Sequence, residues 1–468
     1  MKRLVAGLFA VVVPAAAGAQ GAPDWKAVEA EAIRTIQSYV RINTSNPPGD
    51  VTKAADLLVS LLQREGVPVK RYESAPGRSI VLARLKGTGA AKPILLLHHM
   101  DVVPTDPSRW QHDPFGAEIA DGKIWGRGTM DMKGLGVVQL MAFLSLKRQN
   151  VPLERDVIFM AVPDEEVGGE LGAQWMRKNH YDELDPEYVL DEGGFGSRDL
   201  FAPGKLVFGI SVAEKKILWL KLRAEGVAGH GSQPHDRNPN DKMIRALARL
   251  LGEPMPTTPF SVLQTKRGAA RGEGVPASDE PGGVQGSPPL NMTSRVGPLA
   301  QNKFNNAIQH STISITSFRS GVGEPPKVNV IPSVAEATLD CRVLPGTTKE
   351  QWLAEIRRRL GDPEIKIEIT YEGEDPVVTT QDSKFYKALE SAVKQEHPDA
   401  ILTPMVVPYG TDSNGFRPLG VKSYGFTPVV VPAAAVGSMH GDAEFLPAEA
   451  VGPAIRILFN ALKETVTR

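Results

Sequence analysis

The sequence has a single cysteine, Cys341, among its 468 residues. One cysteine cannot form a disulfide within the chain, so stability must come from the hydrophobic core. A chain of this length can bury a substantial core in two or three domains. Cys341 lies in a strand-like run, residues 337–343 (ATLDCRV), and we predict a buried structural thiol rather than a nucleophile.

An excess of charge of either sign is also missing. Lys and Arg number 53 and Asp and Glu number 54, which gives a net charge of −1. This balance provides no electrostatic case for binding nucleic acid or an anionic membrane surface. With 41% hydrophobic and 23% charged residues, the composition is ordinary for a soluble globular protein.

The apolar run at the N-terminus, residues 4–17, is shorter than the ~20 residues that a membrane-spanning helix needs. It follows the basic start Met1-Lys2-Arg3 and precedes the small residues 17–19 (AGA), which is the layout of a secretory signal peptide. We predict cleavage after Ala19, a periplasmic or secreted protein, and no stable membrane insertion.

The remaining pattern alternates helices with short apolar strands. Helical spacing over residues 25–37, 51–65 and 133–149 alternates with strand-like runs at residues 79–85 and 93–97, and more strands follow. This alternation predicts an α/β domain of three layers around a mostly parallel sheet.

A second unit interrupts this domain. From about residue 212 the order of predicted elements is strand, helix, strand, strand, helix, strand, which is typical of a split βαβ (ferredoxin-like) α+β domain. Between its first helix and second strand lies a long insert rich in Gly, Pro and Ser. The predicted organisation is a signal peptide (1–19), a larger domain in two parts (20–211 and 374–468), and an inserted domain (212–373) with its insert at about 252–305.

Acidic residues and histidines directly follow several of the apolar runs. A short apolar run that ends in such a residue is typical of a buried strand that delivers a polar group to the rim of a sheet, where open α/β sheets bind ligands. Several carboxylates that converge there need a cation, so the sequence predicts a metal site. The residues concerned are His99, Asp101, Asp131, Glu165, Glu166, Asp191, Glu192 and, far downstream, His440.

Carboxylate and imidazole ligands suit a divalent metal of the zinc type, and a carboxylate can bridge two ions. Asp101, two residues after His99, is placed to accept a hydrogen bond from the other imidazole nitrogen. Glu165 and Glu166 are neighbours that leave a strand in different directions, so that one can bind metal while the other stays free as a base. Taken alone, each motif could be a polar loop or solvated surface, but glycines crowd the same positions, as expected where backbone approaches a site closely.

Four motifs in order resemble the signatures of one metallohydrolase family, and the resemblance covers nearly the whole chain after the signal peptide. The family includes aminoacylase, glutamate carboxypeptidase and succinyl-diaminopimelate desuccinylase. The motifs are residues 98–104 (HHMDVVP), 126–134 (GRGTMDMKG), 163–166 (PDEE) and 190–193 (LDEG).

The resemblance implies a centre of two zinc ions, for which Co²⁺ or Mn²⁺ could substitute. It implies that Asp131 bridges the ions, that Glu166 and His440 complete one shell, and that His99 and Glu192 complete the other.

The same resemblance implies that Glu165 is the general base and that Asp101 is the partner of the ligand His99. Relatives supply either Asp or Glu as the ligand at the fourth motif, so Asp191 competes with Glu192 for that role. The alignment of the motif favours Glu192.

The inserted domain resembles the family's lid. The motif GHGSQPH places His230 where a histidine, often reaching across a dimer, stabilises the oxyanion of the intermediate. Asn329 and Arg342 resemble lid residues that grip the substrate's carboxylate, and Gly410 and Thr411 belong to a segment that resembles a substrate-contacting loop. A homodimer through the lid domain is possible on this reading.

The predicted function is hydrolysis of an amide or peptide bond next to a free carboxylate, with a small peptide or an N-acyl amino acid as substrate. Alternatives are an N-acyl-amino-acid or carbamoyl amidohydrolase on the same scaffold and a non-catalytic exported binding protein. A serine hydrolase is disfavoured because the chain lacks a Gly-x-Ser-x-Gly nucleophile elbow.

Overall fold

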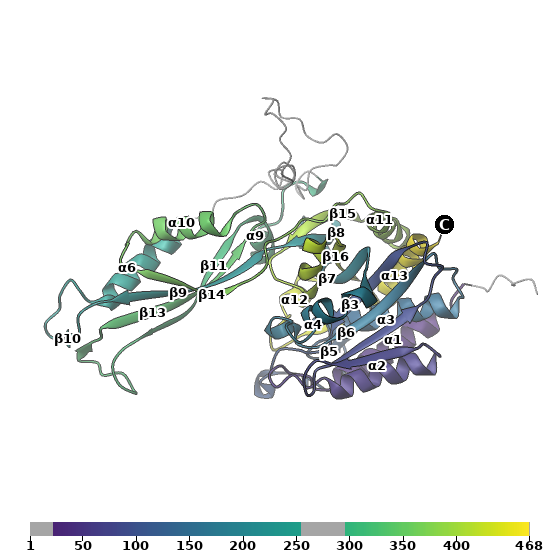
Figure 1. The fold of residues 1–468 in the computed structure, drawn as a ribbon, viewed down its shortest axis with the longest axis horizontal. Coiled ribbons are helices and arrows are strands. Elements are labelled where there is room, and N and C mark those ends of the chain that lie inside the picture. The colour runs from purple at the N-terminus through teal and green to yellow at the C-terminus, as the bar shows by residue number, and fades with distance from the viewer. Residues whose placement is uncertain (1–21, 254–294, 468) are drawn as a thin grey trace, which may run out of the picture.

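The computed structural model describes residues 22–253 and 295–467. The predicted signal peptide and most of the predicted 252–305 insert therefore lie outside the described residues. The described chain forms a larger part around an eight-stranded sheet and a smaller, elongated part around a four-stranded sheet (Figure 1).

The eight-stranded sheet is mixed. Its strands are β1 (Val69–Glu73), β2 (Ser79–Leu85), β3 (Ala91–His99), β6 (Arg155–Val162), β7 (Tyr188–Arg198), β8 (Leu206–Glu214), β15 (Ile401–Val407) and β16 (Lys422–Val430). Their spatial order is β1-β2-β6-β3-β7-β16-β8-β15.

The prediction of a mostly parallel sheet is correct only in part, because parallel pairs at the centre and at the β8–β15 edge stand beside antiparallel ones. The strand β3 pairs in parallel with β6 and β7, and β16 pairs in parallel with β7. By contrast, the pairs β1–β2 and β7–β8 are antiparallel. The reason is the length of the connections, because the few residues between these strands allow a hairpin but not the crossover that a parallel pair needs.

Helices cover both faces of this sheet, which gives three layers. Alternate residues of β3 face opposite sides, so Leu96 belongs to the core beneath one helical layer while Leu95 and Leu97 belong to the core beneath the other. The first layer contains α1 (Trp25–Val40), α2 (Thr52–Arg64), α3 (Lys133–Arg148), α11 (Lys384–Glu396) and α13 (Val451–Val466). The second contains α4 (Ala173–Asn179), α5 (Tyr181–Leu184) and the 3₁₀ helix η4 (Asp412–Leu419).

The four-stranded sheet is antiparallel, in the order β11-β13-β9-β14, and two helices cover one of its faces. Cys341 is buried on this covered face, as the sequence predicts. The elements in chain order are β9 (Lys216–Glu225), α6 (Pro239–Gly252), β11 (Thr312–Ser320), β13 (Val334–Val343), α10 (Lys349–Leu360) and β14 (Lys366–Glu372).

Short elements complete the fold. A two-stranded sheet lies at the end of the smaller part that is remote from the eight-stranded sheet (Figure 1). No helix among the described residues is long and apolar enough to cross a membrane. The short elements are β10 (Gly229–His230) with β12 (Val330–Ile331), a sheet of β4 (Ile119–Ala120), β5 (Lys123–Trp125) and β17 (Phe445–Pro447), and the helices α9 (Lys303–Gln309) and α12 (Ala433–Val436).

Candidate metal centre

Six predicted site residues meet at one rim of the eight-stranded sheet, at the carboxyl ends of its central strands. His99 is the last residue of β3, and Glu165 and Glu166 lie in the turn that follows β6. Asp131 lies just before α3, and His440 lies in the loop after α12. The sixth is Glu192, which comes from β7.

Glu192 reaches this rim through an irregularity in its strand. The apolar run of this strand ends at Leu190, but β7 continues to Arg198. Its pairing with β16 shifts register after Asp191, so that Glu192 and the next residue bulge out of the ladder. A bulge re-aims a side chain without ending the strand, and here it turns Glu192 towards His99.

The two oxygens of Asp131 face two different histidines. Oδ1 lies 3.1 Å from Nε2 of His99, and Oδ2 lies 3.0 Å from Nε2 of His440. Glu192 Oε1 is 3.5 Å from the same atom of His99, and Glu166 Oε2 is 3.2 Å from that of His440. The arrangement is two sets of three donors that share Asp131.

This donor set fits two divalent cations. The atoms of His99, Asp131 and Glu166 lie close enough to one another to hold an ion, and so do those of His99, Glu165 and Glu192. These two groups overlap at His99, so they locate the metal centre without dividing the donors between two ions. Mixed imidazole and carboxylate donors suit zinc, and one carboxylate with an oxygen towards each group suits a bridging position.

The electrostatics of the cluster also favour a cation. Burial, followed by the charge of Asp131, raises the pKa of Glu192 to about 8, and burial raises the pKa of Glu165 well above its usual range. Hydrogen bonds to Asp131 and Glu166 raise the pKa of His440 to about 10. The metal-free cluster therefore holds protons that a bound cation would displace.

Asp101 is close to His99, but not in the predicted way. The Nδ1–H of His99 donates to the backbone carbonyl of Asp101 at 2.9 Å, while the Asp101 carboxylate lies 3.7 Å away. That carboxylate instead accepts the backbone N–H groups of Glu165 and Glu166, at 3.2 and 3.3 Å, and the side-chain amide of Asn46 at 2.9 Å. Asp101 thus positions the turn that carries both glutamates, because it binds the backbone N–H group of each of them.

The geometry separates Asp191 from Glu192. The buried Asp191 carboxylate accepts the N–H of Glu192 and the N–H of Ser413, both at 2.8 Å, so it is directed into the backbone of the η4 segment. Glu192 is the one of the two that faces His99.

The predicted substrate-binding residues divide into two groups. Arg342, Gly410 and Thr411 line a cleft of about 330 Å³ between the metal cluster and the near end of the four-stranded sheet. The Thr411 side chain is already occupied, because its hydroxyl and its backbone N–H both donate to the buried Glu214, at 2.8 and 2.7 Å. Only its position at the cleft wall agrees with the prediction.

His230 and Asn329 lie apart from the cluster. His230 is exposed on β10, and the Asn329 carbonyl accepts the N–H of Gly231 beside it. Figure 1 shows β10 at the end of the smaller part, remote from the eight-stranded sheet. The structure brings these two residues to each other, but within one chain it does not bring them to the metal cluster.

A buried ion pair that sequence reasoning missed joins two of the ligand loops. Glu444 is fully buried, and its Oε1 accepts the backbone N–H groups of Met130 and Asp131 at 2.8 and 3.1 Å. Its Oε2 accepts from Arg127 at 2.5 Å, and Arg127 also donates to the carbonyl of Gly441, next to His440. The sequence contained a signal for this pair, because Arg127 stands in the motif of Asp131 and Glu444 stands four residues after His440.

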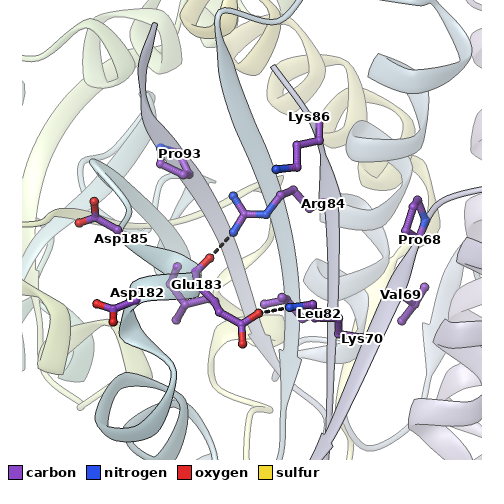
Figure 2. Close-up of a pocket in the computed structure, with 11 residues that line it drawn as sticks. Pro68, Val69, Lys70, Leu82, Arg84, Lys86, Pro93, Asp182, Glu183 and Asp185 are labelled. Atoms are coloured by element: carbon purple, nitrogen blue, oxygen red, sulfur yellow. Dashed lines mark hydrogen bonds and ion pairs between the residues drawn. The ribbon is translucent and has the colours of Figure 1, made fainter. Parts of the chain in front are cut away.

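A second cavity, of about 590 Å³, lies near the beginning of β3 (Figure 2). Several of its charged groups are already paired, because Glu183 binds Lys70 and Arg84 binds both the Glu183 carbonyl and Asp156. The candidate metal groups found in the described residues all contain His99 instead. The metal centre is therefore the candidate active site.

The fold and this carboxylate-rich centre define a metal-dependent hydrolase. The model of peptidase family M20/M25/M40 matches residues 95–464. The chain belongs to this family.

Relatives and a solved structure agree with that membership. The chain is 31% identical to the probable carboxypeptidase S-like 2 of Dictyostelium discoideum, over 80% of this chain and 72% of that protein. It is 25% identical to aminoacylase-1 of Mus musculus, over 86% and 88%. The fold is similar to an M20 family metallo-carboxypeptidase from Sulfolobus solfataricus, with a TM-score of 0.67, 20% identity, and coverage of 93% and 99%.

We expect the metal-free protein to lose stability as the pH rises. The pKa of Glu192 rises from 4.5 to about 8 on folding and that of His440 from 6.5 to about 10, so the folded state holds protons that the unfolded state releases. The resulting stabilisation is present below the unfolded values and is lost as the pH passes the folded ones. Thermal unfolding with a chelator, from about pH 6 to about pH 9, should show a falling Tm, and with excess zinc a flatter profile. Tm profiles that fall equally with pH in the presence and absence of zinc would contradict the assignment of this cluster as the metal site.

We expect Glu444→Gln to weaken metal binding. The variant keeps an oxygen for the two backbone N–H groups but leaves the buried Arg127 without its counter-charge, so both ligand loops lose their anchor. The expected loss is 10- to 100-fold in zinc affinity, the order of magnitude found for partners of metal ligands. Competition with a chromogenic chelator measures it, and the exposed Glu449→Gln is the matched control. Equal affinities in the two variants would show that the pair only stabilises the fold.

Proposed function

We propose that the protein is an exported di-zinc hydrolase that cleaves an amide or peptide bond next to a free carboxylate, of the carboxypeptidase or dipeptidase type. The observation that carries the proposal is the position of Asp131, with one oxygen towards each of two histidines. In this proposal Asp131 bridges the ions, Glu166 and His440 hold one, and His99 and Glu192 hold the other. Zinc is preferred from the ligand types, and Co²⁺ or Mn²⁺ could replace it.

Glu165 is the general base in this proposal. It faces the cluster at 4.0 Å from His99 Nε2, and it also lines the cleft. Bound zinc ions would supply a Lewis acid that polarises the substrate carbonyl and lowers the pKa of water. Glu165 takes the proton from the attacking water and returns it to the leaving amine, and its raised pKa brings it closer to the working pH that such a base needs.

His230 acts across a homodimer in this proposal. Its position at the remote end of the smaller part excludes a contact with the cluster of its own chain in this conformation (Figure 1). A second copy related by a two-fold axis would present its own β10 end to this cluster, where an imidazole N–H could stabilise the oxyanion. The four-stranded part would then serve as lid and dimerisation domain, with Asn329 beside His230.

An N-acyl-amino-acid or carbamoyl amidohydrolase is the second candidate. The match with aminoacylase-1 extends over 86% of the chain, so an acyl group in place of an N-terminal residue is compatible with the scaffold. Turnover of dipeptides compared with N-acyl amino acids separates the two candidates. The predicted signal peptide supports export to the periplasm or the medium.

We expect Glu165→Gln to retain its metal and to lose turnover, because the amide cannot take the proton from water. The expected fall in kcat is on the order of 10²- to 10⁴-fold. Metal analysis and a dipeptide and acyl-amino-acid screen measure the two effects, with the exposed Glu170→Gln as the control. A fully active Glu165→Gln protein would overturn the assignment of the base.

We expect Glu165→Gln and His230→Ala proteins to complement each other. Each homodimer is inactive, but a mixed dimer has one site with an intact Glu165 and an intact partner histidine. Because half of randomly mixed dimers are heterodimers, recovery of up to about a quarter of the wild-type activity is expected. Activity that does not recover after subunit exchange, shown by native mass spectrometry, would contradict the dimer.

A further inference from the structure

One face of the four-stranded sheet extends from the metal cluster outwards. Side chains alternate along a strand, so Lys215, Ile217 and Trp219 project on the same side where the chain enters β9. This is the face opposite α6 and α10, because the intervening Leu218 belongs to the core beneath those helices. All three residues line the cleft that also contains Glu165, Glu166 and His440.

Neighbouring strands extend this face sideways. Arg342 of β13 pairs in register with Ile217, and Tyr371 of β14 pairs with Trp219. Both also line the cleft. Directly opposite residues of neighbouring strands share a face, so Arg342 and Tyr371 lie on the face of Ile217 and Trp219. The cleft wall therefore has two basic residues, Lys215 and Arg342 (the basic row), and three apolar residues, Ile217, Trp219 and Tyr371 (the apolar row).

The basic row is only partly neutralised. Arg342 binds Asp340 through two hydrogen bonds of 2.8 and 3.1 Å, whereas Lys215 forms no ion pair with a carboxylate among the described residues. The Lys215 ammonium donates to the carbonyl of His310 at 2.5 Å, and the residue is 1% exposed. Burial, together with the charge of Arg342, lowers the pKa of Lys215 to about 7. A buried cation with only a carbonyl partner is costly unless an anion joins it.

The apolar row is open to solvent. Trp219 is 44% exposed, and its ring lies 4.8 Å from that of Tyr371, centroid to centroid. Ile217 lies beside Gly410, whose missing side chain keeps this part of the cleft wide. An indole that stacks on a phenol at the wall of a cleft offers a flat apolar surface to a ligand.

We propose that this wall binds the carboxylate-bearing residue of the substrate. Lys215 and Arg342 hold its carboxylate, and Ile217, Trp219 and Tyr371 hold its side chain. The enzyme therefore selects substrates that release an amino acid with a large apolar or aromatic side chain. The assignment rests on the proposed amide hydrolysis, and it adds Lys215 and the aromatic pair as specificity determinants.

The two rows adjoin, which explains why they serve the same substrate residue. In an amide next to a carboxylate, the carboxylate and the side chain leave the same carbon, one bond from the scissile nitrogen. Lys215 comes shortly before Ile217 and Trp219 in the chain, and Arg342 lies directly opposite Ile217, so the two rows adjoin on the cleft wall. A side chain of aromatic size then covers Trp219 while the carboxylate remains at Lys215.

The test measures turnover of four substrates by the zinc-loaded enzyme. They are N-acetyl-phenylalanine, N-acetyl-alanine, alanyl-phenylalanine and alanyl-alanine. We expect kcat/KM for the phenylalanine substrates to exceed that for the alanine substrates by at least about tenfold, and Trp219→Ala to reduce this ratio about fivefold or more. Lys215→Met should raise KM for all four at least about tenfold, with Lys215→Arg partly restoring it. The controls lie outside the cleft: Lys221→Met is on the same sheet face, and the exposed Phe318→Ala is on the opposite face.

Binding provides a readout that does not require turnover. Calorimetric titration of the zinc-loaded Glu165→Gln protein with N-acetyl-phenylalanine should give a Kd at least about tenfold weaker when Lys215→Met or Trp219→Ala is added. A ratio of kcat/KM for phenylalanine to alanine substrates that does not change in Trp219→Ala would overturn this inference, and so would an unchanged Kd in Lys215→Met. Neither result would overturn the proposed amide hydrolysis. Hydrolysis of none of the four substrates would overturn the proposed function and the inference with it.

Discussion

The rest of the structure depends on the burial of several carboxylates around Asp131. Like charges at this distance repel strongly in a poorly solvated site, and the raised pKa values of Glu165 and Glu192 show the cost for the metal-free protein. A divalent cation turns that repulsion into attraction. The cluster is therefore a place where folding and metal binding are linked, because the same groups that disfavour the empty site hold the ion.

Holding such a cluster requires rigid support, which comes from groups that do not face the metal positions. Asp101 and Glu444 each use a buried carboxylate to gather backbone N–H groups of ligand loops, and Arg127 links the Asp131 loop to the His440 loop. Asp191 does the same for η4. Each buried acid is thus assigned a role by its partners, since a carboxylate that accepts two or three N–H bonds is not free to bind an ion.

In the proposed function, the second sheet gives this centre its substrate wall. Because β9 begins where β8 ends, the side chains that leave the larger part at Lys215 continue outwards as one face of the smaller part. Glu214, the last residue of β8, is anchored at this junction by Arg417 and Thr411. The opposite end of the same sheet carries His230, so one small domain presents different residues to its own cluster and to that of a proposed partner.

The sequence by itself determined the family, the set of cluster residues and most of the helices and strands, because short motifs carry metal ligands and periodicity carries secondary structure. Strands such as β8 and β15 were missed, since a strand buried on both faces shows no alternation. Only the tertiary structure decided that Glu192 rather than Asp191 faces His99, and that the Asp101 carboxylate supports the glutamate turn. It also decided that Glu444 and Arg127 pair across more than three hundred residues. Finally, it decided that His230 lies far from the cluster of its own chain. The physical reason is common to all four, because the direction of a side chain depends on bulges, loops and partners distant in the chain, which no local pattern records.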